Sequence, residues 1–174
     1  VAKMLFTDDG DTFLCSGTLM NDARGSRTPY FLTANHCIST QASASSLVTY
    51  WFFRAASCNS SPAYDAAMTR VTGGAQLLYS DSSVDTTLLQ LNSAPPARVV
   101  YAGSYFGTGT VAGVAVAGVH HPKGDLQKYS VGAVAGYANC GEDSCTYVSS
   151  DSSTMYQVGW TQGTTEGGSS GSAI

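Results

Sequence analysis

Charged residues are scarce in this chain of 174 residues, at 11% against roughly 25% in an ordinary globular domain. The net charge is −4, so we expect no basic surface of the kind that binds nucleic acid. Long apolar runs are also absent. The longest, residues 111–119, contains two glycines and falls well short of the roughly 20 residues that span a bilayer. Neither nucleic acid nor a membrane is therefore an expected partner.

Cysteines paired at metal-ligand spacing are missing as well. The five cysteines include no Cys-x-x-Cys pair, the usual arrangement of zinc ligands, so the sequence favours disulfides. Disulfides persist in oxidising compartments, and they predict a protein that is extracellular (secreted) or periplasmic. An odd number of cysteines leaves one that is free or pairs outside this chain. The alternative hypothesis is a zinc site made from His36, Cys37, His120 and His121.

Helical periodicity is nearly absent, whereas short β-prone stretches recur along the chain. Residues 47–53, 86–91 and 110–116 are such stretches, and clusters of Gly, Ser, Asn, Asp and Pro lie between them. Short strands separated by turn signals predict an all-β fold. The segment 92–97 contains adjacent prolines, which cannot lie inside a central strand. It is the predicted boundary between two β-units.

The first segment of chemical interest is Thr33-Ala-Asn-His-Cys37, which places His36 beside a cysteine at the end of an apolar strand. On its own, a histidine in that position is more often structural than catalytic. A bridge between Cys15 and Cys37 would join two strands and fix the backbone next to His36. Closing a loop of about 20 residues typically contributes 2–4 kcal/mol.

An acidic residue, Asp85, stands at the start of the apolar stretch 86–91. It could be an ordinary turn residue, and Asp81 nearby could fill the same role. The functional interpretation is that the Asp85 carboxylate accepts the Nδ1 proton of His36. That contact would hold the imidazole in the tautomer whose Nε2 can take a proton from a hydroxyl.

A third segment, residues 166–173, is a run of glycine and serine that composition alone would assign to a flexible linker. A serine flanked by glycines also permits a tight turn whose successive backbone N–H groups point to one spot. On that interpretation Ser170 is a nucleophile, and the N–H groups of Gly168 and Ser170 form an oxyanion hole. Losing one such donor typically costs 10²–10³ in rate.

Together these segments resemble the signatures of the chymotrypsin-like serine proteases: Thr33-Ala-Asn-His-Cys37, Asp85-Thr-Thr-Leu-Leu-Gln-Leu91 and Gly168-Ser-Ser-Gly-Ser-Ala173. Cys15-Ser-Gly-Thr-Leu19 is similar to the strand that bears the disulfide of the histidine loop in that family. Within the superfamily, two further segments resemble the bacterial lysyl endopeptidase branch, His120-His-Pro122 and Thr165-Glu-Gly-Gly-Ser-Ser-Gly-Ser172. The resemblance covers the whole chain.

The resemblance implies a chymotrypsin-like double six-stranded Greek-key β-barrel. Residues 1–94 would form the first barrel and carry His36 and Asp85, and residues 95–174 would form part of a second, incomplete barrel that carries Ser170. The implied activity is that of a secreted serine endopeptidase that needs no cofactor, acts on proteins or peptides through an acyl-enzyme, and cleaves after lysine or another basic residue. The alternative is a non-catalytic secreted module that keeps the protease fold.

Two positions depart from the pattern of animal trypsins. Ser169 stands where those enzymes carry the aspartate that pairs with the freshly cut N-terminus, so activation by that ion pair is not expected. Thr164 stands where they carry the acid that selects basic substrates. The resemblance places His120 and His121 near a strand and outside the triad, and a structural role is expected for both.

The ends of the chain also depart from the family pattern, because the family begins earlier and continues beyond Ile174. The chain is therefore expected to be a fragment whose partners include the missing N- and C-terminal segments of the same protease. The resemblance further implies that Cys58 pairs with a cysteine in the missing N-terminal segment. Cys140 and Cys145 are expected to pair with each other across a turn.

Overall fold

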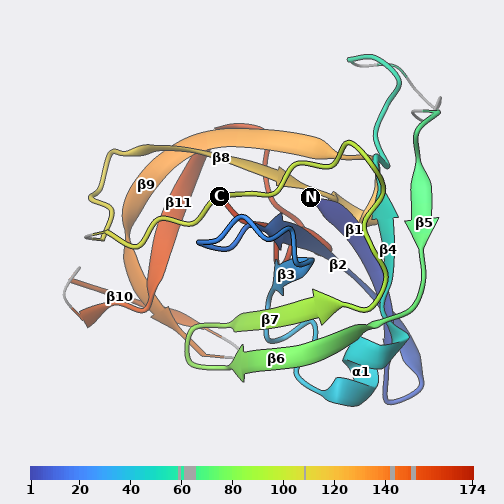
Figure 1. The fold of residues 1–174 in the computed structure, drawn as a ribbon. Helices are drawn as coiled ribbons and strands as arrows, with labels where there is room; N and C mark the ends of the chain where they lie inside the picture. Colours follow the sequence, from blue (N-terminus) through green and yellow to red (C-terminus); the bar gives the residue numbers. More distant parts are fainter. Residues whose placement is uncertain (59, 61–65, 108, 142–143, 150–151) are drawn as a thin grey trace.

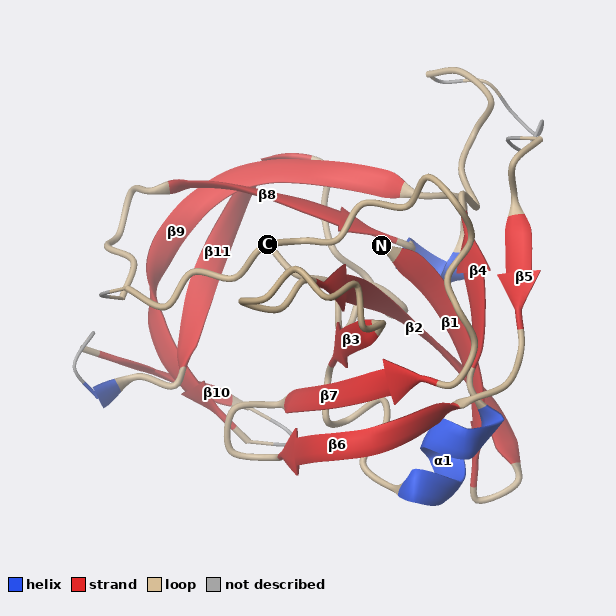
Figure 2. Cartoon of the chain, in the orientation of Figure 1, coloured by secondary structure: helices blue, strands red, loops and turns tan. Residues whose placement is uncertain are grey.

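The computed structural model describes residues 1–58, 60, 66–107, 109–141, 144–149 and 152–174, and these residues are mostly β-structure (Figures 1 and 2). They form two antiparallel sheets, as the all-β prediction requires. The first sheet has seven strands in the order β5-β4-β1-β2-β3-β7-β6. In chain order its strands are β1 (Ala2–Asp8), β2 (Asp11–Met20), β3 (Tyr30–Thr33), β4 (Val48–Trp51), β5 (Thr69–Val71), β6 (Ala75–Asp81) and β7 (Thr86–Leu91).

The second sheet is built around one long strand. Its members are β8 (Ala115–His120), β9 (Lys128–Cys140), β10 (Cys145–Val148) and β11 (Met155–Gln162), and a 3-10 turn at Pro122–Gly124 follows β8. The strand order is β10-β9-β11, and β8 pairs with the first half of β9. Within the described residues neither sheet is closed by pairing between its edge strands. The described residues therefore form the two sheets that were expected, but these sheets do not close into two barrels.

The hydrophobic core lies against the first sheet because its strands alternate apolar and polar positions. Strand β1 buries every second residue, Ala2, Met4 and Phe6, as the two-residue period of a strand requires. At the centre Phe31 of β3 packs edge-on against Trp51 of β4, with 5.9 Å between the ring centroids. This packing fixes β3, the strand that precedes His36.

Two of the three predicted β-stretches are strands. Residues 86–91 coincide with β7, and 47–53 contain the shorter β4. The prediction for 110–116 was wrong over residues 110–114, because β8 begins only at Ala115. The reason is a turn at Gly113, whose φ of 91° lies in the left-handed region, closed by the Val114 N–H donating to the Val111 carbonyl.

A short helix, α1 (Gln41–Ser46), was not predicted. Its residues are small and polar, so they carry no apolar periodicity. It begins at Thr40, whose side-chain oxygen accepts a hydrogen bond from the Ser43 N–H at 3.2 Å, the usual way to cap a helix start. In the part of the chain that the structure describes, no helix has the length and apolar character to cross a membrane.

The predicted boundary at residue 94 stays a prediction. Strand β7 ends at Leu91 and β8 begins at Ala115, and an isolated bridge between Met20 and Ala102 ties the intervening segment to the first sheet. The chain returns to the first sheet near its end, where the Ala173 N–H donates to the Thr18 hydroxyl of β2 at 3.1 Å. This last contact brings the glycine–serine segment against β2.

Candidate active site

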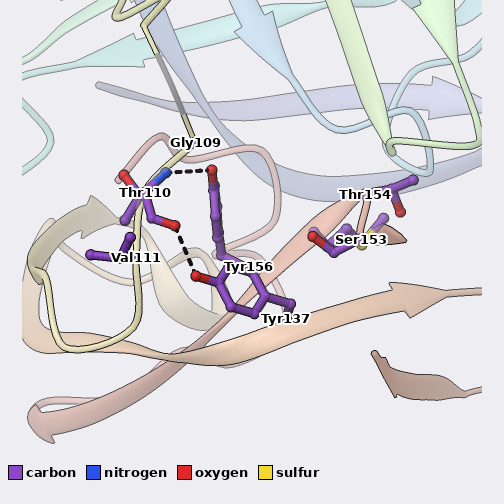
Figure 3. Close-up of a pocket in the computed structure, with 8 residues that line it drawn as sticks. Gly109, Thr110, Val111, Tyr137, Ser153, Thr154 and Tyr156 are labelled. Carbon is purple, nitrogen blue, oxygen red and sulfur yellow. Dashed lines mark hydrogen bonds between the residues drawn. The ribbon is translucent and has the colours of Figure 1, made fainter. Parts of the chain in front are cut away.

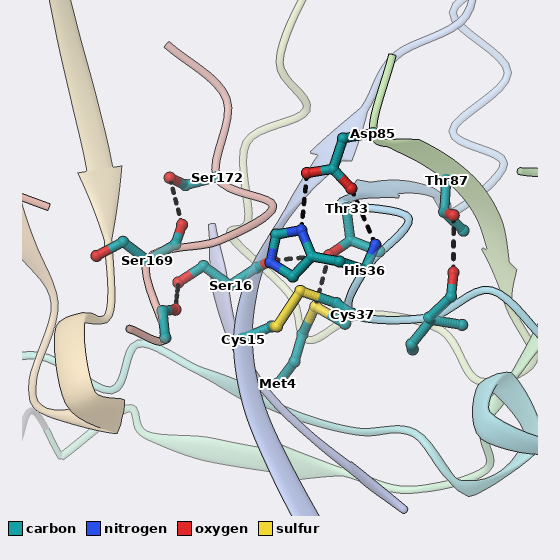
Figure 4. Close-up of a disulfide and its surroundings, with 12 residues drawn as sticks. Met4, Cys15, Ser16, Thr33, His36, Cys37, Asp85, Thr87, Ser169 and Ser172 are labelled. Carbon is teal, nitrogen blue, oxygen red and sulfur yellow. Dashed lines mark hydrogen bonds and ion pairs between the residues drawn. A yellow bond between two sulfur atoms is a disulfide. The ribbon is translucent and has the colours of Figure 1, made fainter. Parts of the chain in front are cut away.

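His36 and Asp85 are in direct contact, as the sequence predicted (Figure 4). The Nδ1 atom of His36 lies 2.7 Å from one carboxylate oxygen of Asp85, and the backbone N–H of His36 donates to the other at 2.9 Å. Because both carboxylate oxygens bind the same residue, the ring and its backbone are oriented together. A carboxylate can only accept, so the Nδ1 atom carries the hydrogen and Nε2 is left as an acceptor.

Strand pairing explains why these two residues meet although 49 positions separate them. His36 lies three residues beyond the end of β3 at Thr33, and Asp85 immediately precedes β7. Thr33 and Thr87 are register partners in the β3–β7 pair. Asp85 itself has a φ of 47°, a left-handed conformation that aspartate tolerates better than most residues.

The alternative acid, Asp81, is engaged elsewhere. Its carboxylate accepts from the Ser83 N–H at 2.8 Å and from the Tyr79 hydroxyl at 2.7 Å. The Ser83 hydroxyl also donates to this carboxylate. Together these bonds lower the pKa of the Asp81 carboxyl, and the bond from the Ser83 hydroxyl contributes most. Asp81 therefore stabilises the turn between β6 and β7, and Asp85 is the acid that contacts His36.

The predicted bridge between Cys15 and Cys37 is present and lies next to the histidine (Figure 4). It joins β2 to the residue that follows His36, with 6.4 Å between the Cα atoms. The zinc hypothesis is wrong in its use of Cys37, because a sulfur in a disulfide cannot act as a thiolate ligand. The second predicted bridge, Cys140–Cys145, is also present. Cys58 is exposed and has no disulfide partner among the described residues.

The glycine–serine segment packs tightly on β2 and is no linker. The Ser16 N–H donates to the Ser170 carbonyl at 2.8 Å, and the Ser16 hydroxyl donates to the Gly168 carbonyl at 2.8 Å. Gly171 has a φ of 82°, and a Cβ atom there would collide with the Thr33 hydroxyl and the Ser16 carbonyl. Ser16 was not predicted, although it lies next to Cys15 in a segment that the sequence had already marked.

The structure distinguishes the three serines of this segment. The Ser169 hydroxyl lies 2.9 Å from His120 Nδ1, and the Ser172 hydroxyl donates to the Ser169 carbonyl at 2.8 Å. The Ser170 hydroxyl has no hydrogen-bond partner among the described residues. It is therefore the serine of the segment that can react without first breaking a bond.

Two backbone N–H groups of the same turn are also unpaired. Within the described residues, no acceptor binds the N–H of Gly168 or of Ser170, whereas the N–H of Ser169 donates to the Glu166 carbonyl. The Lys123 N–H donates to the Gly167 carbonyl, and the Ser16 hydroxyl donates to the Gly168 carbonyl. Among the described residues, the turn thus has two backbone donors and one hydroxyl without a partner.

His36 and Asp85 open onto a groove of about 910 Å³ between the two sheets. Cys140 and Met155 of the second sheet form its other wall, together with Gly141, which follows β9. Ser170 faces a separate, shallower hollow formed by its own turn, and no hydrogen bond joins it to His36 among the residues described.

A further hollow lies on the second sheet and shares Met155 with the groove at His36 and Asp85 (Figure 3). Its walls include two tyrosines whose hydroxyls bond to Thr110. The Thr110 N–H donates to Tyr156 at 3.0 Å, and the Tyr137 hydroxyl donates to the Thr110 carbonyl at 3.1 Å. None of the predicted site residues lines it.

Two adjacent histidines, His120 and His121, are each only 1% exposed. His121 donates through Nδ1 to the Asp125 carbonyl at 3.0 Å, and its buried Nε2 has no partner in the described structure. Burial lowers the pKa of His121 from an ordinary value near 6.5 to about 4. The imidazole is therefore neutral at neutral pH.

This burial predicts a loss of stability in acid. Between pH 6.5 and 4 the unfolded chain binds a proton at His121 that the folded chain does not, so the free energy of unfolding falls as the pH falls. The expected contribution is up to about 3 kcal/mol, since one pKa unit corresponds to about 1.4 kcal/mol. Urea denaturation at several pH values measures it. His121→Asn keeps a donor for Asp125 and removes the titration, so an equally steep pH dependence in that variant would contradict the assignment.

Two antiparallel sheets, with a histidine–aspartate pair on one and a tightly held serine turn between them, are the arrangement of the trypsin-like serine protease fold. Solved structures agree on the fold. The Rv3671c protease of M. tuberculosis in its active form superposes with a TM-score of 0.59 over 98% of this chain and 62% of its own, at 16% identity. A thermostable serine protease, AL20, from an extremophilic microorganism gives a TM-score of 0.58 over 98% of this chain and 75% of its own, at 14% identity.

The chain belongs to the family described as lysyl endopeptidase, C-terminal domain, which matches residues 1–174. A curated relative, the lysyl endopeptidase of Pseudomonas aeruginosa, is 39% identical over 178 aligned positions. The alignment covers all of this chain but only 36% of that protein. The chain thus spans about a third of the length of the curated relative it matches.

Proposed function

We propose that this chain carries the catalytic machinery of a secreted serine endopeptidase, with His36, Asp85 and Ser170 as its triad. The observation that carries the proposal is the double contact of Asp85 with His36, which leaves Nε2 of the ring as a proton acceptor. The free hydroxyl of Ser170 supports it. So does the anchoring of the Ser170 carbonyl on Ser16, next to the cysteine that is bridged to Cys37.

The proposed reaction has two halves. Ser170 Oγ attacks the scissile carbonyl carbon while His36 Nε2 takes the hydroxyl proton, and His36 then gives that proton to the leaving amine. The product of this half is an acyl-enzyme on Ser170. In the second half a water molecule attacks the ester carbonyl, with His36 again moving the proton, and the carboxylic acid leaves. Asp85 keeps its contacts with His36 throughout and stabilises the imidazolium that forms in each half.

The N–H groups of Gly168 and Ser170 are proposed to bind the oxyanion of both tetrahedral intermediates. Neither group has to break a bond first, because neither has an acceptor among the described residues. Donors fixed in advance cost no reorganisation in the transition state, which is why such groups contribute about 10²–10³ each to the rate. The left-handed conformation of Gly168, at a φ of 91°, sets the direction of the turn.

The full arrangement that we propose is the double β-barrel of this class, with residues 1–94 in the first barrel and 95–174 in an incomplete second one. The groove between the two sheets supports this division because the histidine–aspartate pair and its opposite wall come from different sheets. The two disulfides support secretion, since such bonds persist in oxidising compartments. The substrates would be proteins or peptides, and other segments of the same protease would be partners.

Cleavage after lysine, or after another basic residue, is the proposed specificity. The name of the relative from Pseudomonas aeruginosa supports lysine, and so does membership of the family. Thr164, six positions before Ser170, offers no charge to a basic side chain, so the acid that selects it would come from elsewhere. Hydrolysis of matched peptides ending in lysine, arginine or leucine amides would rank the three side chains.

Covalent labelling by a fluorophosphonate, followed by peptide mapping, tests the proposed function. Only a serine activated by a base and an oxyanion hole reacts rapidly with this reagent. In the full-length gene product we expect one rapidly labelled residue, Ser170. Labelling should fall at least a thousandfold in His36→Ala, because the serine then lacks its base.

The alternative function, a non-catalytic module with the protease fold, predicts the opposite result. Such a module would show no rapid labelling in the full-length product, although the disulfides and the fold were intact. Rapid labelling at Ser169 or Ser172 in place of Ser170 would overturn the choice of nucleophile and leave the class unchanged.

A further inference from the structure

A continuous chain of hydrogen bonds runs behind the Ser170 turn, and the proposed reaction does not use it directly. At its centre is His120, the last residue of β8, which is 1% exposed. Its Nδ1 atom lies 2.9 Å from the Ser169 hydroxyl, and its Nε2 atom lies 3.0 Å from the Ser130 hydroxyl of β9. Both ring nitrogens of this buried histidine therefore have a hydroxyl partner.

The outermost bonds of this hydrogen-bond network fix the direction of every hydrogen in it. Ser130 donates its single hydroxyl hydrogen to the Thr164 carbonyl at 3.0 Å, so it must accept from His120 Nε2. The Nδ1 atom of a neutral imidazole is then an acceptor, and Ser169 donates to it. The Ser169 oxygen in turn accepts the Glu166 N–H at 3.1 Å. One tautomer of neutral His120 thus satisfies all of these bonds at once.

The hydrogen-bond network reaches both ends of the segment that leads into the nucleophile. Thr164 lies at the start of this segment and Ser169 at its end, next to Ser170. Gly168, whose N–H is one of the two unpaired donors, lies between them. A single buried ring can therefore set the conformation of the whole loop that presents the two donors.

The surroundings of His120 favour the neutral ring that this arrangement needs. Burial lowers the pKa of His120 below its ordinary value. The charged groups of the loops packed nearby, Lys123 and Glu166, form an ion pair with each other at 2.9 Å and lie largely in solvent. A proton added to Nδ1 would turn that atom into a donor, and the Ser169 hydroxyl could then no longer donate to it.

We propose that His120 is a positioning residue, which holds the Gly168–Ser170 turn through Ser169 and Ser130 so that the two unpaired N–H groups are set for the oxyanion. The inference rests on the proposed function of Ser170. The role of His120 is to stabilise the conformation that the transition state needs. Loss of the His120 ring should therefore lower kcat and leave KM nearly unchanged.

The test compares three variants of the full-length gene product. His120→Phe fills the same space but removes both bonds, and we expect kcat to fall 10²–10³-fold with KM within threefold, the size of losing an oxyanion donor. The inhibition constant of a peptide aldehyde, which forms an oxyanion on Ser170, should rise in parallel. In His120→Asn the amide oxygen can replace Nδ1 as the acceptor for Ser169, and we expect at least a tenfold recovery of kcat over His120→Phe. His121→Asn is the matched control at the adjacent buried histidine, with kcat within fivefold of the unaltered protein.

Several results would overturn the inference. A kcat within threefold of the unaltered protein in His120→Phe would do so, as would equal losses in His120→Asn and His120→Phe. If His120→Phe does not fold, Ser169→Ala decides instead, because it removes only one hydroxyl. An unchanged kcat and aldehyde affinity in Ser169→Ala would then reject the role. Rapid labelling of the unaltered protein at Ser170 separates these outcomes from a failure of the proposed function, which would abolish labelling before any variant is made.

Discussion

Replacing Ser170 by alanine is expected to lower kcat for peptide hydrolysis by a factor on the order of 10⁶, the scale on which serine proteases lose activity without their nucleophile. The reason is that no neighbouring hydroxyl can take over. Ser169 is bound to His120 and Ser172 is bound to the Ser169 carbonyl, so each is held in another role. The measurement is steady-state hydrolysis of a lysine amide substrate by the full-length product, with circular dichroism to show that the fold is kept.

Ser172→Ala is the matched control for this prediction. It removes a hydroxyl from the same turn but costs only one ordinary hydrogen bond, so kcat should fall less than tenfold. A Ser170→Ala variant that keeps more than a hundredth of the original kcat would show that Ser170 is not the nucleophile. Activity retained in Ser170→Ala but lost in Ser172→Ala would assign the role to Ser172.

The second large effect is expected at Asp85, where asparagine should lower kcat about 10⁴-fold. The two contacts with His36 explain why an isosteric change is so costly. If the amide nitrogen faces the ring, Nδ1 must become the acceptor and the hydrogen moves to Nε2, where it blocks proton transfer. If the amide turns over, its nitrogen faces the backbone N–H of His36, and two donors oppose each other.

Asp81→Asn provides the comparison for the change at Asp85. Asp81 is the same type of residue and lies four positions earlier, but its bonds go to Ser83 and Tyr79. We expect the kcat of Asp81→Asn to stay within threefold of that of the unaltered protein. Both variants are measured with the same lysine amide substrate, at a concentration that saturates each enzyme. Equal activity of Asp85→Asn and the unaltered protein would exclude Asp85 from the triad.

These predictions share one structural cause, which is that β2 supports both halves of the site. Cys15 is bridged to the residue after His36, and Ser16 holds the Ser170 carbonyl and the Gly168 carbonyl. Consecutive residues on one strand thus anchor the histidine loop and the serine turn. Since core strands are the least mobile part of a domain, this places the His36 loop and the Ser170 turn on a rigid support.

The sequence by itself determined the class of fold, predicted both disulfides, and limited the acid that meets His36 to Asp85 or Asp81. Each depends on a local signal: turn residues between β-prone stretches, cysteines at strand ends, and an acid at the start of an apolar strand. Where local signals conflicted, prediction failed. Residues 110–116 have the composition of a strand, but the turn at Gly113 delays β8 to Ala115. Helix α1 was missed because its start depends on a cap at Thr40 and its residues carry no apolar period.

Only the tertiary structure decided which serine of the turn is free, which of two aspartates meets His36, and what the buried histidines contact. Ser169, Ser170 and Ser172 are alike in sequence, and they differ only in whether β8 or the turn itself occupies their hydroxyls. His120 and Ser130 meet because β8 pairs with β9, so their spacing along the chain carries no signal. A hydrogen bond depends on distances of a few tenths of an ångström across separate strands. Such distances are set by packing, and a linear pattern of residue types cannot express them.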